Sequence, residues 1–201
     1  WKDLAEGLKY VLTLPGLLAV ILSAMVINFL VSPAFSLLPL MVTDYFKKGA
    51  IELGVLDSVI SIGFLAGGLI LSIWGGFKNR LLTSFLFLVI MGICIALFGL
   101  VPNSNFYLAV GVLSLVGISN PLVNGPLHAA LQARVDPDKQ GRVFTLLGAG
   151  ASLAMPIGLA IAGPLSDAIG VQFWFIIGGI LCVILAILIM ANKKVLQLGK
   201  D

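Results

Sequence analysis

The sequence has 201 residues, of which 60% are hydrophobic and 10% charged, and its formal net charge is +3. An average soluble domain carries about 25% charged residues, and a soluble core at this length could not bury so much apolar surface. This composition excludes an ordinary soluble domain and predicts a surface that faces lipid. The positive net charge does not predict a nucleic-acid partner, because the basic residues form no run and lie between apolar segments.

The first predicted element is an amphipathic segment, residues 1–15, at the cytoplasmic membrane surface. Apolar residues at Leu4, Leu8, Val11 and Leu12 are separated by Lys and Glu, a spacing typical of a helix that lies along a bilayer. The chain opens at Trp1 without an initiator Met or a signal-peptide pattern. We therefore expect it to be a fragment of a longer protein.

Six apolar segments follow, each long enough to cross a bilayer core of about 30 Å as a helix. Their predicted bounds are Gly16–Val42, Leu53–Gly75, Leu81–Val101, Phe106–Leu131, Val143–Leu165 and Phe173–Ala191. The runs are continuous and lack the two-residue alternation of barrel strands. We predict an all-α membrane protein, a six-transmembrane-helix bundle over residues 16–191, followed by a cytoplasmic tail over 192–201.

The distribution of Lys and Arg predicts the orientation of this bundle. One side receives ten basic residues and the other receives only Lys47 and Lys48. Cytoplasmic loops carry the excess of Lys and Arg in membrane proteins. Both termini are thus expected in the cytoplasm of a multi-pass protein of the cell inner (plasma) membrane. The ten residues are Lys2, Lys9, Lys78, Arg80, Arg134, Lys139, Arg142, Lys193, Lys194 and Lys200.

The spans also suggest an internal repeat. Three spans followed by three spans form inverted repeats, because an odd number of crossings reverses direction. The first span carries Asn28 with Pro33 and Pro39, and the fourth carries Asn120 and Asn124 with two prolines. Helices interrupted at matching positions of two repeats are the usual indication of a transporter's binding site.

Polar rows on these two spans are the candidate substrate-cavity residues. In the fourth span Asn120, Asn124, His128 and Gln132 recur every four residues and form one slowly winding polar row. The first span has a shorter row of Asn28, Ser32 and Ser36. Amides in hydrocarbon must face protein or a water-filled cavity. Two interpretations remain open, a substrate pathway or hydrogen bonding between helices, and His128 could also reach interfacial water.

Acidic residues within the spans are candidates for ion coupling. Asp57, one turn into the second span, is the possible coupling residue, while Asp44 and Asp167 lie near the outer ends of their spans. The preferred interpretation of each of the three is an interfacial charge that reaches water. One His without a second ligand predicts no metal site. No phosphate-binding loop, dinucleotide fingerprint or catalytic motif occurs, so we expect no enzyme and no cofactor.

Two further features are a polar loop and clustered glycines. The loop Arg134–Arg142 is predicted to be cytoplasmic, with Arg134, Asp136, Gly141 and Arg142 as its notable residues. Glycines spaced at Gly63 and Gly67, and at Gly148, Gly150, Gly158 and Gly163, predict close helix packing, with helix sliding as a secondary benefit.

The sequence resembles a known transporter family. The run Ile118–Gly148, ISNPLVNGPLHAALQARVDPDKQGRVFTLLG, resembles the junction of helices ten and eleven in major facilitator superfamily transporters, most closely the branch with bacterial macrolide-efflux proteins. Asp3–Leu17 and Pro156–Gly170 are similar to that branch near helices seven and eleven. Ser72 and Ile73 stand where the superfamily's signature loop has an Asp and a basic residue, which argues against its charged latch here.

The resemblance implies a fold and a function. The chain would be the C-terminal half of a major facilitator fold, with its first and fourth spans facing a central cavity and its third and sixth facing lipid. It would be half of a secondary active exporter of hydrophobic small molecules or drugs, driven by an ion gradient. Its partners would be the bilayer, the N-terminal six-helix half and the substrate. The alternative is a non-transporting structural or pore-forming bundle that acts as a homo-oligomer. The sequence shows neither the charge rings nor the carbonyl filter expected of a channel.

Overall fold

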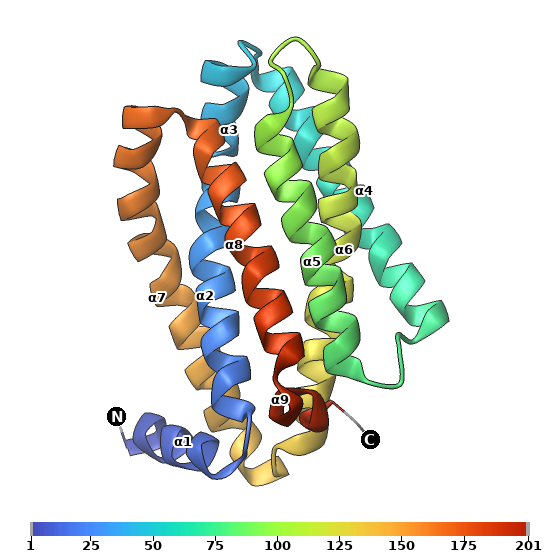
Figure 1. Cartoon of the computed structure of the whole chain (residues 1–201), viewed down its shortest axis with the longest axis vertical. Coiled ribbons are helices and arrows are strands. Elements are labelled where there is room, and N and C mark those ends of the chain that lie inside the picture. The colour runs from blue at the N-terminus through green and yellow to red at the C-terminus, as the bar shows by residue number, and fades with distance from the viewer. Residues whose placement is uncertain (1, 200–201) are drawn as a thin grey trace.

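The computed structural model describes residues 2–199, and within them it leaves the side chains of residues 2–6 and 8 undescribed. The predictions for Trp1, for the side chains of Lys2, Leu4 and Leu8, and for Lys200 therefore fall outside it. Long helices run side by side along the molecule, and a short helix lies across one end (Figure 1). The elements in chain order are α1 (Lys2–Thr13), α2 (Leu17–Ser36), α3 (Leu38–Leu40), the π-helix η1 (Met41–Tyr45), α4 (Ala50–Trp74), α5 (Arg80–Leu100), α6 (Phe106–Arg134), α7 (Pro137–Ile169), α8 (Val171–Ala191) and α9 (Lys193–Leu198).

The predicted six-helix membrane bundle is confirmed. Among residues 2–199, six helices are long and apolar enough to cross a bilayer, namely α2, α4, α5, α6, α7 and α8. The same part of the chain contains no strand. Each of these helices matches one predicted span, so the continuous apolar runs were sufficient to find them.

The packing of the spans repeats itself between the two halves of the bundle. The main contacts pair α2 with α7, α4 with α6, α5 with α8, α5 with α6 and α2 with α8. If α2 is exchanged with α6, α4 with α7 and α5 with α8, the same set of pairs results. The α5–α8 pair maps onto itself and thus lies at the centre of the exchange. This symmetry is the one expected for two inverted three-helix repeats.

Glycines allow the paired helices to approach closely. A Cβ added at Gly63 of α4 would lie 2.6 Å from the carbonyl oxygen of Ser114 in α6. On the other side of the bundle, a Cβ at Gly158 of α7 would lie 2.6 Å from the carbonyl oxygen of Phe29 in α2. The predicted packing role is right for Gly63, Gly67, Gly150 and Gly158. Gly148 and Gly163 have no such contact within this chain, because an added Cβ at either would meet nothing within 4 Å.

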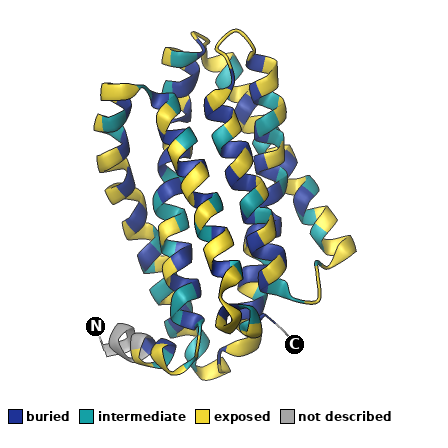
Figure 2. Ribbon diagram, in the orientation of Figure 1, coloured by how far each residue is buried: buried dark blue, intermediate teal, exposed yellow. Residues whose placement is uncertain are grey.

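Exposed residues occur along all of the spans (Figure 2), but the exposed faces differ in residue composition. On α5 and α8 the exposed residues form rows of large apolar side chains, such as Ile90, Ile93 and Leu97 on α5. These rows suit lipid contact. On α4 and α7, of which only 17% of each apolar window is buried, exposed Ser and Gly residues interrupt the apolar surface.

The first predicted span is interrupted in the structure. Helix α2 ends at Ser36, Leu37 forms a turn, and α3 and η1 continue the chain to Tyr45. Pro39 has no N–H to donate, and its ring clashes with the carbonyl four residues before it, which ends a regular helix. The backbone therefore changes its winding near Pro39, one of the two prolines that the sequence analysis identified within this span.

The predicted loop Arg134–Arg142 is much shorter than expected. Only Val135 and Asp136 separate α6 from α7, since α7 already begins at Pro137 and contains Gly141 and Arg142. Proline is favoured in the first helical turn, where its missing N–H has no partner to lose. The predicted tail 192–201 likewise holds a short helix, α9.

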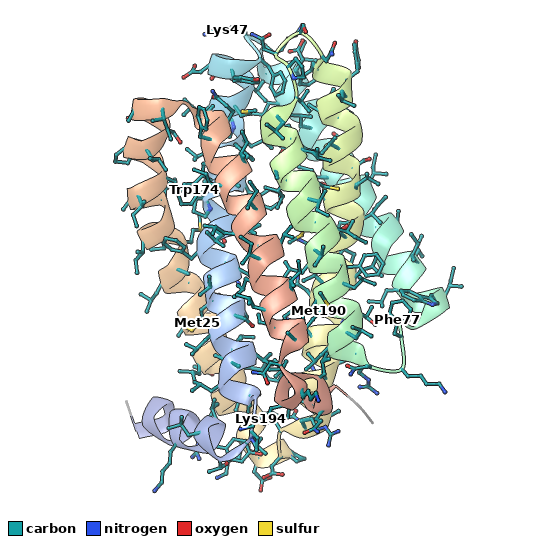
Figure 3. The ribbon with its side chains drawn as sticks, viewed as in Figure 1. Met25, Lys47, Phe77, Trp174, Met190 and Lys194 are labelled. Carbon is teal, nitrogen blue, oxygen red and sulfur yellow. The ribbon has the colours of Figure 1, made fainter. Side chains whose placement is uncertain are left out.

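Helices α1 and α9 lie at the same end of the bundle, here called the α1/α9 end, and η1 lies at the opposite end (Figure 1). The connections α4–α5 and α6–α7 are also at the α1/α9 end. Figure 3 places Lys47 at the η1 end and Lys194 at the α1/α9 end. The predicted segregation of basic residues is therefore a property of the fold.

Candidate functional site

The polar row of α6 lies on the surface of the chain within a membrane span. Asn124, His128 and Gln132 are exposed and Asn120 is half-buried. The Asn124 side-chain amide donates to the backbone carbonyl and to the side-chain oxygen of Asn120, each at 3.1 Å. Two amides are thus joined along one helix face, with polar capacity left for a further partner.

The polar row of α2 has the same character. The Asn28 side-chain amide donates to the carbonyl of Ala24 in its own helix at 2.8 Å, and the Ser36 hydroxyl donates to the carbonyl of Ser32 at 3.2 Å. Asn28 and Ser32 are half-buried and Ser36 is exposed. The two rows belong to equivalent helices of the two repeats.

Hydrogen bonds between helices are made by other residues. The Ser84 hydroxyl donates to the carbonyl of Val123 at 2.6 Å, and the Trp174 indole N–H donates to the carbonyl of Leu30 at 3.2 Å. Tyr45 similarly joins η1 to Val101 at 3.0 Å. Within residues 2–199, none of the hydrogen bonds of Asn28, Ser36 or Asn124 reaches another helix. Sequence reasoning missed Ser84 and Trp174, since an isolated polar residue in an apolar run gives no periodic signal.

His128 contacts the neighbouring span rather than standing alone. Its ring stacks on Phe144 of α7, with 5.7 Å between ring centroids and 25° between planes. The described residues contain no group of three or more His, Cys, Asp or Glu side chains that could hold a metal ion. His128 therefore links α6 to α7 at one end of the polar row.

Asp57, the possible coupling residue, lies on an exposed face of α4. Helix α4 packs against α6 at Gly63 and Gly67, and these two residues and Leu56 are its buried residues. The hydroxyl of Ser61 donates to the backbone carbonyl of Asp57 at 2.8 Å. The structure therefore leaves the Asp57 carboxylate on the outside of the described bundle and does not bring it into the polar rows.

Arg134 and Asp136 connect helices at the α1/α9 end. Arg134 donates from Nε to the carbonyl of Leu198 at 3.0 Å and from Nη2 to that of Gln197 at 3.3 Å. The backbone N–H of Asp136 donates to the Tyr10 hydroxyl at 3.1 Å. The backbone of Arg142 lies against Gly7, where an added Cβ would be 3.3 Å from the Arg142 carbonyl oxygen. These residues tie α1, α6, α7 and α9 together.

We expect Arg134→Ala to loosen α9. The variant loses two charge-assisted hydrogen bonds to carbonyls at the C-terminal end of that helix, where a cation is favourable. A net contribution of about 1 kcal/mol corresponds to amide exchange about fivefold faster over residues 193–199. Hydrogen exchange read by mass spectrometry measures this. Lys139→Ala, which removes one positive charge from the first turn of α7, is the control, and equal acceleration in both variants would contradict the proposed contact.

Comparison with known proteins places this bundle in a family. The profile of the Major Facilitator Superfamily matches residues 3–196, nearly the whole chain. The chain belongs to the Major Facilitator Superfamily. This agrees with the predicted resemblance and with the two inverted triplets of helices.

Several efflux proteins of the superfamily are similar to the chain. Macrolide efflux protein A of Streptococcus pyogenes is 34% identical over 186 residues, which is 92% of this chain and 46% of that protein. Macrolide efflux protein A of Enterococcus faecalis is 34% identical over 158 residues, 79% of this chain and 49% of that protein. The multidrug efflux pump Tap of Mycolicibacterium fortuitum is 29% identical over 178 residues, 86% of this chain and 42% of that protein. The chain thus spans about half the length of the curated relatives it matches.

Proposed function

We propose that this chain forms one half of a secondary active exporter of hydrophobic small molecules or drugs. The observation that carries the proposal is the pair of polar rows on α2 and α6, which lie within membrane spans, and in which the hydrogen bonds of Asn28, Ser36 and Asn124 stay within their own helices. The similarity to efflux proteins over most of the chain supports the same class of function. Asn28, Ser32, Ser36, Asn120, Asn124 and His128 would contribute to the cavity wall.

Alternating access is the mechanism that fits this arrangement. The six-helix bundle would rock against a second bundle, so that a midplane site faces one side of the membrane and then the other. The energy would come from an ion gradient. Asp57 is the proposed coupling residue, because its carboxylate lies on an exposed face of α4 within a span.

The exposed faces of α4 and α7 support a second six-helix half as the partner. On α4, Gly54, Ser58, Ser61, Gly68 and Ser72 recur along the face opposite Gly63 and Gly67. The hydroxyls of Ser58, Ser61 and Ser72 each donate to the carbonyl four residues earlier at 2.7 to 2.8 Å. Small residues with internally bonded hydroxyls form a smooth surface suited to another helix.

In the proposed orientation, the α1/α9 end lies on the cytoplasmic side of the cell membrane. The described basic residues at that end include Lys9, Lys78, Arg134 and Lys194, whereas Lys47 and Lys48 lie near η1. Positive charge is retained on the cytoplasmic side during insertion. Helix α1 would then lie in the headgroup region, with its buried residue Val11 against the bundle.

The polar rows can be tested in the complete transporter. We expect Asn124→Ala or Asn120→Ala to lower drug export about tenfold, since losing one hydrogen bond to a substrate in a dry cavity is worth about 1.4 kcal/mol. Export at unchanged expression is measured in proteoliposomes or by drug resistance of cells. Ser114→Ala is the control, because Ser114 is on α6 and also bonds its own helix, at Gly111. Unchanged export in both Asn variants would refute the cavity assignment.

A further inference from the structure

Two exposed lysines lie where the apolar surface of α8 ends. Ile187, Leu188 and Ala191 lie on one exposed face of the last turns of α8, and Leu188 is 64% exposed. Lys193 and Lys194 follow directly, in the first turn of α9, and both are exposed. An apolar face suited to lipid thus leads to two positive charges at the α1/α9 end of the bundle (Figure 2).

The helix that carries these lysines is fixed to the bundle. Helix α9 contacts α2, α5 and α8, and its residue Val195 is fully buried. The side-chain amide of Asn79 donates to the carbonyl of Leu196 at 2.8 Å. The backbone N–H of Arg80 donates to the carbonyl of Gly199 at 3.1 Å. The lysine side chains therefore extend from a fixed backbone and not from a free tail.

A third exposed lysine, Lys78, directly precedes the residue whose amide bonds α9. Beside it, Phe77 and Trp74 are each 43% exposed and meet edge to face, with 4.8 Å between ring centroids. Trp74 also contacts Phe87 of α5, at 6.1 Å. Exposed tryptophan is typical of the headgroup level of a bilayer. Figure 3 shows Phe77 toward the same end of the molecule as Lys194. The three lysines, here called the α9 patch, are Lys78, Lys193 and Lys194.

The α9 patch has no acidic partner in the part of the chain that is described. The sequence contains no Asp or Glu between positions 57 and 136 or between positions 167 and 201, stretches that include α5, α6, α8 and α9. The acids described at this end, Asp136 and Asp138, belong to the start of α7. Three exposed positive charges thus lie together without an opposite charge from residues 2–199, which favours an anionic partner.

An apolar groove on the same face indicates that this partner has an acyl chain. The groove lies between α5 and α8 and has a volume of about 230 Å³. Its lining includes Ile93, Leu97, Ile180 and Ile184, each close to half exposed, and no polar side chain. Nine residues separate Ile184 from Lys193, which is about 14 Å along a helix. Half of a bilayer core is about 15 Å, so a chain attached to a headgroup at the lysines reaches the groove.

We infer that the α9 patch binds the headgroup of an anionic phospholipid. The three ammonium groups meet its negative charge, while the lysine stems and the acyl chains lie along the exposed rows of α5 and α8. Basic residues beside a spanning helix attract anionic lipid, with a gain of about fivefold in affinity for each lysine. A zwitterionic phospholipid carries its own cation and lacks this attraction. The inference depends neither on what the protein transports nor on which end faces the cytoplasm.

Energy transfer from the tryptophans of the purified chain to a pyrene-labelled acyl chain measures lipid binding in detergent micelles. Labelled phosphatidylglycerol is the anionic probe, and phosphatidylcholine with the same labelled chain is the zwitterionic one. Three lysines at about fivefold each predict a preference for phosphatidylglycerol on the order of 100-fold. Lys193→Gln combined with Lys194→Gln should weaken phosphatidylglycerol binding about thirtyfold and leave phosphatidylcholine binding unchanged. The preference should disappear in 1 M NaCl, where the Debye length is about 3 Å.

Lys47→Gln combined with Lys48→Gln is the matched control. It also removes two adjacent exposed lysines, but at the η1 end, so each double variant lowers the net charge from +3 by two, to +1. We expect this control to keep the full preference. Equal losses in the two double variants would indicate attraction by net charge alone and would overturn the inference.

Two other results would also overturn it. One is equal affinity of the unsubstituted chain for the two lipids. The other is displacement of phosphatidylglycerol by an equal concentration of inorganic phosphate, which would assign the α9 patch to a soluble anion. Circular dichroism and unchanged phosphatidylcholine binding establish that each variant is folded, so a loss of phosphatidylglycerol binding can be attributed to the missing lysines.

Discussion

Gly67→Ala is expected to destabilise the bundle by roughly 1–3 kcal/mol, and Gly67→Leu by more, as is typical of overpacking. A Cβ at Gly67 would overlap the carbonyl oxygen of Ile118 and lie 2.7 Å from Cγ of Pro121. Both atoms belong to α6, so neither can move without shifting that helix. Helix α4 has one main neighbour, α6, and a substitution at their contact should detach α4 from the bundle.

The adjacent residue provides the control for this prediction. Gly68→Ala adds the same methyl group where nothing lies within 4 Å, so we expect a change within about 0.5 kcal/mol or a slight gain from higher helix propensity. Reversible unfolding in mixed detergent micelles measures both variants. Equal destabilisation at the two positions would show that the backbone freedom of glycine, and not close packing, is what α4 requires.

The membrane architecture could be predicted from the sequence because its cause is local. Twenty apolar residues in a row must span as a helix wherever they stand, so all six spans were found. The inverted repeat was also predictable, since an odd number of crossings fixes it. Glycine spacing was less informative. Gly150 and Gly158 contact α2 whereas Gly148 and Gly163 face open space, because the face of a helix that meets a neighbour depends on tertiary packing.

Features that depend on distant parts of the chain could not be predicted in this way. Arg134 was identified as a loop residue, but its partners are carbonyls of α9, more than sixty residues later. Asp44 and Asp167 were interpreted as separate interfacial charges, whereas the packing of α2 against α7 brings both to one cavity. Within the candidate site, the sequence indicated the polar rows of α2 and α6 by their spacing. It did not indicate that their hydrogen bonds stay within each helix.

The other large effect is expected at the open glycines of α4 and α7. In the complete transporter, Gly68→Leu and Gly148→Leu should reduce export to less than about a tenth, because a leucine would separate two helices that meet through small residues. An added Cβ at either glycine meets nothing within this chain, so the fold of the chain itself should be unaffected. Export in proteoliposomes and unfolding of the chain alone separate the two effects.

Gly111→Leu is the matched control for these variants. Gly111 is exposed on α6 and also has nothing within 4 Å of an added Cβ. Nine residues separate it from Asn120, which places the two on opposite faces of α6 at about 100° per residue. We expect this face to contact lipid and the variant to retain export.

If Gly68→Leu and Gly148→Leu also retain export, α4 and α7 face lipid, and the proposed second half contacts the bundle elsewhere. If the chain alone transports the drug, the half-site proposal is wrong. If the chain alone self-associates and transports no drug, and Gly68→Leu abolishes the self-association, the non-transporting homo-oligomeric alternative is favoured.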